Sequence, residues 1–477
     1  MTLAFWPRLV ARCDGPRALG ILMLIAIVLC PLLPFYNVVD FDVAFLAWTA
    51  EKWLHGAVYG RDILEINPPL CMFLYLPAAL LAPVTGLEWG VRLSMLGLTL
   101  LSIAALWRSA GTAMRLPLAA MLLVFVSLAY PNFFAQREQI ALLLTAPYVA
   151  GAMPGRRWGL LSGLMAAVGF LMKPHFLIPL ALIVALRRSI GREEKVIAAA
   201  GIAYGVILLA FFRPYLTEMI PMGSGAYWAS GWPVEDLILQ AAVVLLSTLP
   251  LAATGATAAE PAARPYLLAA LGFMAAAVLQ GRGFYYHFLP AFGYVALYLT
   301  VLTFNPRPLV AGAAAAFLAV NALLIGRMAA IWFANAAELA PSEVTLLAEL
   351  DRSASFISFV PQPYPAFPTA IHTRARYVGL SSSGVAFSGP VARYETGLSP
   401  SIPAEAERLT RWQALRELAR QPEVVITLDA PVAIGGRPFD ILDWLMKDED
   451  FRAAWSHYRA DRTIGPFRLY RRVEAAP

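Results

Sequence analysis

Apolar segments separated by short polar stretches follow one another from residue 18 to residue 326. Several approach the length of about 20 residues that a helix needs to cross a bilayer, which predicts a polytopic α-helical membrane protein. No small-residue cleavage site follows the first segment, so we expect it to remain as a span. The segments fall near residues 18–36, 68–87, 91–107, 114–130, 138–153, 157–172, 175–186, 196–212, 236–254, 265–279, 288–304 and 308–326.

The positive charges between these segments indicate which of them span. If all twelve crossed, three consecutive basic clusters would lie outside, although Lys and Arg tend to remain in the cytoplasm. Excluding 68–87, which begins with Pro68-Pro69, moves all three clusters inside. We therefore expect about 11 spans, with 68–87 as a re-entrant or interfacial segment in a first outer loop at 37–90. The clusters are Arg108 with Arg115, Arg156 with Arg157, and Arg187, Arg188 and Arg192 with Lys195.

With this topology, residues 1–17 are cytoplasmic, 18–326 form the transmembrane domain, and 327–477 are extracytoplasmic. Charged residues and prolines become more frequent in the last segment. A helix and short strands there predict a small α/β domain. The expected strands are 357–360, 424–428 and 467–472. The expected helix is 404–420, with Ser401 as a possible cap and an apolar face of Leu409, Trp412, Leu415 and Leu418.

Composition supports a membrane location. Hydrophobic residues make up 59% of the chain and charged residues 14%, whereas soluble domains carry about 25% charged residues. Mean hydropathy is +0.64. The net charge of +6 does not indicate a nucleic-acid partner, and we expect none. The three cysteines are scattered and none follows Cys71, which excludes a disulfide framework.

Carboxylates are concentrated in the first outer loop. A carboxylate at a membrane boundary costs free energy unless it faces water, a partner or a substrate. Asp40 and Asp42 follow the first span, and each suits either a helix cap or a general base with a tuning neighbour. Glu65 lies just before Pro68-Pro69, which would fix its direction, although a surface glutamate before a helix is the alternative. We expect the loop's other acids, Glu51 and Asp62, to be solvated or paired with Lys52 and Arg61.

The predicted outer side also carries cationic turns. Arg137, and Lys173 with His175, lie at span ends, where they suit either phosphate binding or contact with lipid head groups. The turn at 280–287 holds two glycines, cations and aromatic residues, which would allow close approach to a ligand. Its candidate ligand-binding residues are Arg282, His287 and Tyr286, although tyrosines at this depth often form an interfacial belt.

Several of these motifs together resemble the GT-C superfamily of membrane glycosyltransferases. EKWLHGAVYGRDILEINPPL at 51–70, after an acidic pair, resembles the first loop of lipid A aminoarabinose transferases and protein O-mannosyltransferases. KPHF at 173–176 and QGRGFYYHFLP at 280–290 look like motifs of bacterial members. One departure is Asn67, which stands where the aminoarabinose enzymes have a lysine, and the soluble tail is also short.

The resemblance implies an inverting glycosyltransferase of the plasma (bacterial inner) membrane. It would move a sugar from a polyprenyl-phosphate donor to an envelope acceptor, which could be a lipid, a polysaccharide or a protein. Carried over, Asp42 would be the base with Asp40 as substitute, and Glu65 would bind acceptor or donor. Lys173, His175, Arg282 or His287 would stabilise the departing lipid phosphate. The resemblance requires no nucleotide, and the acidic loop would also suit a divalent cation.

Two other functions remain open at this point. A transporter or flippase of lipid-linked sugars would place charges at mid-span and show repeated halves, whereas here the charges gather towards one face. A non-catalytic envelope-assembly protein of the same fold would have lost its acidic residues. Neither the sugar nor the acceptor follows from the sequence.

Overall fold

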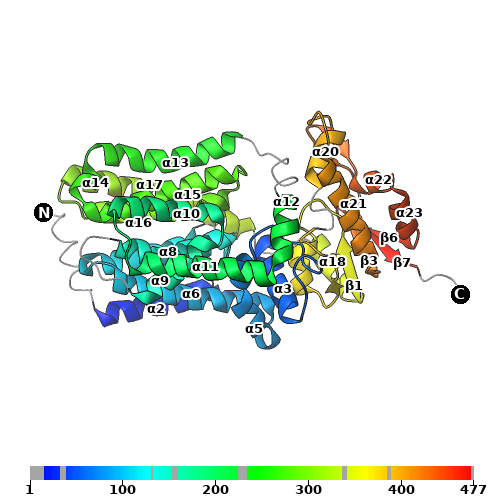
Figure 1. Cartoon of the computed structure of the whole chain (residues 1–477), viewed down its shortest axis with the longest axis horizontal. Coiled ribbons are helices and arrows are strands. Elements are labelled where there is room, and N and C mark those ends of the chain that lie inside the picture. The colour runs from blue at the N-terminus through cyan, green and yellow to red at the C-terminus, as the bar shows by residue number, and fades with distance from the viewer. Residues whose placement is uncertain are drawn as a thin grey trace. The chain divides into compact units, whose positions relative to one another are not determined.

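The computed structural model describes residues 15–32, 39–129, 133–152, 159–223, 234–335, 341–383 and 388–473. The chain forms two compact units, each assembled from separate stretches of sequence (Figure 1). The first unit comprises Met1–Val38, Trp89–Ile207 and Trp232–Ala337. The second comprises Val39–Glu88, Leu208–Gly231 and Glu338–Pro477.

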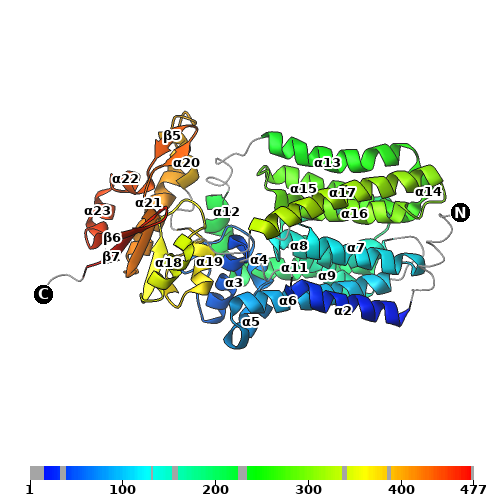
Figure 2. The same ribbon diagram turned by 180° about the vertical axis from the view of Figure 1, so that it is seen from behind.

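The first unit is a bundle of helices that run side by side in both views (Figures 1 and 2). Short 3-10 turns join several of them. The helices are α2 (Pro16–Leu32), α6 (Leu87–Ser109), η2 (Thr112–Met114), α7 (Arg115–Leu128), α8 (Arg137–Gly151), α9 (Leu160–Leu171), η4 (Pro174–Phe176), α10 (Leu177–Arg187), α11 (Arg192–Phe211), α13 (Val234–Ala253), α14 (Ala256–Ala259), η8 (Pro261–Ala263), α15 (Arg264–Gln280), η9 (Tyr285–Phe288), α16 (Leu289–Leu302) and α17 (Pro308–Asn335).

Six apolar helical stretches among the described residues are long enough to cross a membrane, and five more are apolar but shorter. The expectation of a multi-pass helical membrane protein is therefore confirmed, while the count of 11 spans stays a prediction. The six stretches are Leu87–Ser109, Arg192–Phe211, Val234–Ala253, Pro261–Gln280, Tyr285–Leu302 and Pro308–Arg327.

Helices α8 and α16 form the centre of this unit. Every residue of α8 is buried, as is 83% of the stretch that contains α16. The two helices approach closely at Gly293, where a side chain would collide with Leu142. Small residues at such contacts let backbones pack tightly in membrane bundles.

The outermost helices present apolar side chains outward. Only 11% of the α11 stretch and 17% of the α17 stretch is buried. Ile202 and Val206 on α11 and Leu323 on α17 are among the exposed residues. In water such a surface would be unfavourable, whereas the acyl chains of a bilayer cover it at no cost.

The second unit combines helices with two small sheets. Its helices are α3 (Phe41–Leu54), α4 (Pro69–Phe73), α5 (Leu76–Thr85), η5 (Tyr215–Met219), α12 (Ile220–Met222), α18 (Pro341–Leu350), α19 (Ala366–His372), α20 (Ser388–Glu395), α21 (Ala404–Leu418), α22 (Ile441–Leu445) and α23 (Glu449–Trp455). Its strands are β1 (Ser355–Ser358), β2 (Arg376–Tyr377), β3 (Val424–Leu428), β4 (Val432–Ile434), β5 (Arg437–Phe439), β6 (Tyr458–Ile464) and β7 (Phe467–Arg472).

The larger sheet has the strand order β2-β1-β3-β7-β6. Strand β1 is parallel to β2 and β3, and β7 is antiparallel to β3 and β6. The predicted α/β character of the tail is confirmed. Strands β3 and β7 have the expected bounds, while β1 begins and ends two residues earlier than expected.

The first-loop helix α3 packs against the tail within this unit (Figure 2). Its rings Phe45 and Trp48 lie 5.3 and 5.4 Å from the ring of Phe367 in α19, edge to face. The backbone of Leu64 donates to the carbonyl of Leu380 at 2.7 Å. The first loop is therefore folded together with residues of the tail.

Charged groups strengthen this junction. The Lys52 ammonium donates to the carbonyl oxygens of Asp62, at 2.8 Å, and Gly379, at 3.2 Å. Burial lowers the pKa of Lys52 to about 8. The Asp62 carboxylate accepts from Arg61 at 2.8 Å and from Arg420 at 3.2 Å. The expected pairing of Asp62 with Arg61 is thus confirmed.

Helix α21 buries only part of the expected face, because Leu409 and Leu418 are buried as predicted and the other two members are not. Trp412 and Leu415 are only half-buried, whereas Gln413 and Glu417 are fully buried. Glu417 Oε1 accepts from the Leu380 N–H at 2.9 Å and from Gln413 Nε2 at 2.9 Å. Pro403 precedes the helix and no side chain caps it, so the expected Ser401 cap is wrong.

The proline-rich segment 68–87, within the first outer loop, is divided into α4 and α5. The longer of the two, α5, has 10 residues, or about 15 Å of helix, against a bilayer core of about 30 Å. Neither helix is long enough to cross alone. Its re-entrant or interfacial placement stays a prediction.

The burial of Glu417 in α21 can be tested through the pH dependence of the protein's stability. Burial raises the pKa of Glu417 from 4.5 to about 7, so its neutral form is favoured in the folded state. Its contribution to stability is therefore fully present below pH 4.5 and is lost as the pH rises through 7. We expect Glu417→Gln to reduce the fall in thermal unfolding temperature of the full-length protein between pH 5 and pH 8.

Glu407→Gln, on a more accessible part of the same helix, serves as the control and should leave the pH profile of the wild type in place. An identical pH profile for wild type and Glu417→Gln would contradict the burial of an ionisable group at this junction.

Candidate functional site

Three turns of the first unit bring polar side chains together. They are the start of α8, the turn from α9 into η4, and the turn from α15 into η9. The Lys173 ammonium lies 2.6 Å from Glu138 Oε1 and 3.0 Å from Gln280 Oε1. Arg137, His175 and His287 are close enough to interact electrostatically with this pair. We call these six residues the Lys173 cluster.

Five of the six residues of the Lys173 cluster are buried, and His175 is half-buried. Lys173 is 4% exposed, Glu138 0% and His287 2%. The lipid-contact alternative for Lys173 is therefore excluded within this unit, because its ammonium pairs with a buried carboxylate. A buried ion pair persists only where further hydrogen bonds hold both partners, and Gln280 provides one of them.

The turn at 280–287 owes its shape to two glycines and a neighbouring helix. Gly281 and Gly283 have φ values of 65° and 64°, a left-handed conformation that other residues rarely adopt. Gln240 on α13 donates through Nε2 to the carbonyl of Gly283 at 2.7 Å. Arg282, between the glycines, is 6% exposed. Gln240 was not predicted from the sequence.

Aromatic rings stabilise the end of the same turn. Tyr286 is buried and stacks on Phe284 at 5.3 Å, and its ring lies 4.5 Å from that of His287. Tyr285 is 45% exposed, which suits an interfacial belt residue. The two neighbouring tyrosines thus have different environments, and only Tyr286 lies beside the cluster.

The start of α8 is held by a strained turn. Ala135 has φ 65°, which is uncommon for a residue with a side chain, and its N–H donates to Gln139 Oε1 at 2.7 Å. Gln139 Nε2 donates to the carbonyl of Val126 at 2.8 Å. Gln139 therefore fixes the turn that presents Arg137 and Glu138. Such strain is often found at functional sites.

Hydrogen-bonding atoms without partners are concentrated here. Buried polar atoms in native proteins almost always have a partner, which can be a water molecule or a bound ligand. Within the described residues, the atoms in or beside the Lys173 cluster that lack a protein partner include Glu138 Oε2, His175 Nε2, Gln240 Oε1, Gln280 Nε2 and His287 Nδ1.

The candidate carboxylates belong to the second unit. Asp40 caps α3, accepting the N–H of Asp42 at 2.9 Å, so its expected capping role is confirmed. Asp42 occupies the first turn of α3 and is half-buried. Glu65 is 7% exposed, and its Oε1 accepts both the backbone and side-chain N–H of Asn67 at 2.6 Å. Tyr59 donates to the carbonyl of Glu65, also at 2.6 Å.

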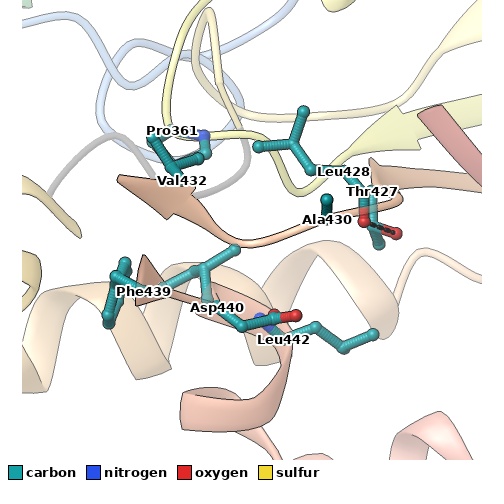
Figure 3. Close-up of a pocket in the computed structure, with 9 residues that line it drawn as sticks. Pro361, Thr427, Leu428, Ala430, Val432, Phe439, Asp440 and Leu442 are labelled. Atoms are coloured by element: carbon teal, nitrogen blue, oxygen red, sulfur yellow. Dashed lines mark hydrogen bonds between the residues drawn. The ribbon is translucent and has the colours of Figure 1, made fainter. Parts of the chain in front are cut away.

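Two other kinds of site find little support in the structure. No three His, Cys, Asp or Glu side chains in the described parts of the chain are placed to hold a metal ion together. Figure 3 shows a hollow beside the ends of β3 and β5, lined mainly by apolar residues. Its cavity volume is about 10 Å³, enough for about one water molecule and far below the range of about 300–1,000 Å³ typical of ligand pockets. Its carboxylate, Asp440, caps α22.

Comparison with known proteins identifies the fold. No family model matches the sequence, and no curated protein does. The structure is similar to that of ArnT from Cupriavidus metallidurans bound to undecaprenyl phosphate, with a TM-score of 0.54 and 13% sequence identity. The match covers 96% of this chain and 98% of that chain. This chain therefore shares its fold with that structure over nearly its whole length, as the resemblance predicted.

The ion pair at the centre of the cluster predicts a double-mutant result. Lys173→Met leaves Glu138 buried without its cation, which costs about 3–5 kcal/mol, so we expect a large fall in unfolding temperature. The double variant Lys173→Met/Glu138→Gln removes both charges and should recover most of the loss. Thermal unfolding of the purified protein in nanodiscs measures both effects. Additive losses in the double variant would show that the two groups do not depend on each other.

Proposed function

We propose that this protein is an inverting glycosyltransferase that moves a sugar from a polyprenyl-phosphate donor to an envelope acceptor, which is a lipid, a polysaccharide or a protein. The observation that carries the proposal is the buried cationic Lys173 cluster with its unmet hydrogen-bonding atoms. The fold supports it, because the similar transferase structure holds undecaprenyl phosphate. A polyprenyl chain also requires apolar surroundings, which the outer helices provide.

In this proposal the cations hold the donor phosphate. Arg137, Lys173 and Arg282 carry charge, and His175 and His287 offer ring nitrogens. Charge-assisted hydrogen bonds to phosphate are among the strongest in proteins. They also strengthen as the sugar leaves, because negative charge then develops on the phosphate oxygen. Tyr286 would hold the sugar or the His287 ring in place.

The transfer itself requires a base. The acceptor hydroxyl attacks the anomeric carbon from the face opposite the phosphate, and Asp42 takes up the hydroxyl proton. The bond between that carbon and the phosphate oxygen breaks, its electron pair remains on the oxygen, and polyprenyl phosphate leaves. General base catalysis of this kind contributes about 10²–10⁴ in rate. Glu65 would bind the acceptor or the donor.

The geometry of α3 favours Asp42 over Asp40 as the base. Asp40 Oδ1 is engaged in the helix cap, and its loss would weaken the start of the helix. Asp42 follows directly in the first turn. Asp40 would therefore orient the base and serve only as a substitute for it.

Two substitutions separate chemistry from donor binding. We expect Asp42→Asn to reduce transfer to membrane acceptors by at least about 100-fold while polyprenyl-phosphate binding is retained. Arg282→Ala should instead weaken binding of polyprenyl phosphate by about 10- to 100-fold, because a charge-assisted bond is lost. Transfer is measured with labelled lipid-linked sugar in proteoliposomes, and Arg108→Ala is the control for a charge change elsewhere. Wild-type transfer by Asp42→Asn would remove Asp42 from the mechanism.

The proposal also fixes an orientation. The N-terminus would be cytoplasmic and residues 327–477 extracytoplasmic, on the side where lipid-linked sugars meet envelope acceptors. In a background without the native cysteines, Ser456→Cys should react with a membrane-impermeant maleimide added to intact cells. Arg108→Cys should react only after the membrane is permeabilised. The reverse pattern would contradict this orientation.

A further inference from the structure

The hydrogen bonds of Gln240 and Gln280 determine which amide atom of each side chain is left without a protein partner. Gln240 Nε2 donates to the carbonyls of Gly283, at 2.7 Å, and Asp236, at 3.1 Å. Carbonyl oxygens only accept, so the nitrogen of Gln240 must face them and Oε1 must point elsewhere. Gln280 Oε1 accepts from Lys173, which leaves Gln280 Nε2 as the outward donor. The amide orientations therefore follow from chemistry.

The unmet atoms beside the Lys173 cluster include two acceptors. Glu138 Oε2 and Gln240 Oε1 are buried and have no partner among the described residues. Lys173 occupies the other oxygen of Glu138. The phosphodiester of a lipid-linked sugar has acceptor oxygens and no proton, so it cannot satisfy either atom. A ligand that satisfies these two atoms directly must therefore bring O–H or N–H donors besides its phosphate.

The charges around Glu138 distinguish between a hydroxyl group and an amino group as the hydrogen-bond donor. Glu138 already interacts with the cations of Lys173 and Arg137. An ammonium group on Glu138 Oε2 would be a third cation around one carboxylate, and like charges repel strongly where water is excluded. A hydroxyl donates without adding charge. The environment of Glu138 therefore favours hydroxyl groups over amino groups.

We infer that Glu138 Oε2 and Gln240 Oε1 accept hydrogen bonds from hydroxyl groups of the donor sugar, so the protein selects a neutral, hydroxylated sugar over an amino sugar. This inference rests on the proposed function and specifies the substrate class of the same site. It makes Gln240 a specificity-determining residue. It also separates this chain from an aminoarabinose transferase despite the shared fold.

The test compares three lipids on the full-length protein in nanodiscs. They are polyprenyl phosphate, polyprenyl-phosphate glucose, and the same lipid carrying 4-amino-4-deoxyglucose. We expect the wild type to bind the glucose lipid at least about tenfold more tightly than the amino-sugar lipid. Equal or tighter binding of the amino-sugar lipid would overturn the inference.

Variants at Gln240 test the residue itself. Gln240→Met should weaken binding of the glucose lipid by about three- to tenfold, as expected for the loss of one neutral hydrogen bond. Binding of bare polyprenyl phosphate should not change. Gln240→Glu keeps an acceptor and adds a negative charge, so it should shift preference towards the amino-sugar lipid. Thr248→Val on the same helix, where the hydroxyl bonds only within α13, should bind all three lipids as the wild type does.

The outcomes distinguish this inference from the proposed function. If Gln240→Met weakens binding of bare polyprenyl phosphate as much as binding of the glucose lipid, Gln240 acts only through the turn at Gly283. The inference is then wrong, while the proposed function stands. If the wild type binds bare phosphate but neither glycosylated lipid, the inference is also wrong. If it binds none of the three lipids, the proposed function itself fails.

Discussion

A charged group inside an apolar helical bundle needs a partner, and the pair of Lys173 with Glu138 meets this requirement. Glu138 lies at the start of α8 and Lys173 in the turn between α9 and η4, and Gln280, at the end of α15, accepts from the same ammonium. Removing any one member would leave buried polarity unsatisfied. The pair therefore fixes three turns relative to one another, and the shape of the candidate binding site follows from it.

Much of the fold was predictable because the membrane imposes simple rules. Apolar length predicted the helical bundle, and short apolar runs between turn residues predicted strands 424–428 and 467–472 with their observed bounds. The burial of Leu409 and Leu418 in α21 was predictable, whereas that of Gln413 and Glu417 was not, since they are polar residues. They are buried because Glu417 receives the Leu380 N–H, a contact between segments far apart in sequence.

Site residues were predictable where a charged residue interrupted an apolar segment. They were not predictable where the interrupting residue was polar but uncharged. Lys173, His175 and His287 were identified by position, and the structure places them together. Glu138 was noted in the sequence only as the neighbour of Arg137. Gln240 was not predicted, because a single glutamine in an apolar helix has several ordinary structural explanations. A signal was available, since an amide in a membrane span is costly without a partner. Its partner, the carbonyl of Gly283, belongs to another segment.

The junction between the first loop and the tail has a consequence for biogenesis. Lys52 and Gly379 are 327 residues apart in sequence, and Asp62 and Arg420 are 358 residues apart. At about 5–20 residues per second, ribosomes require about 20–70 s to synthesise that separation. Throughout this interval the emerging loop lacks its hydrogen-bonding partners. The first loop is thus among the last segments to fold, and a truncation that removes residues 366–420 would leave it without these partners.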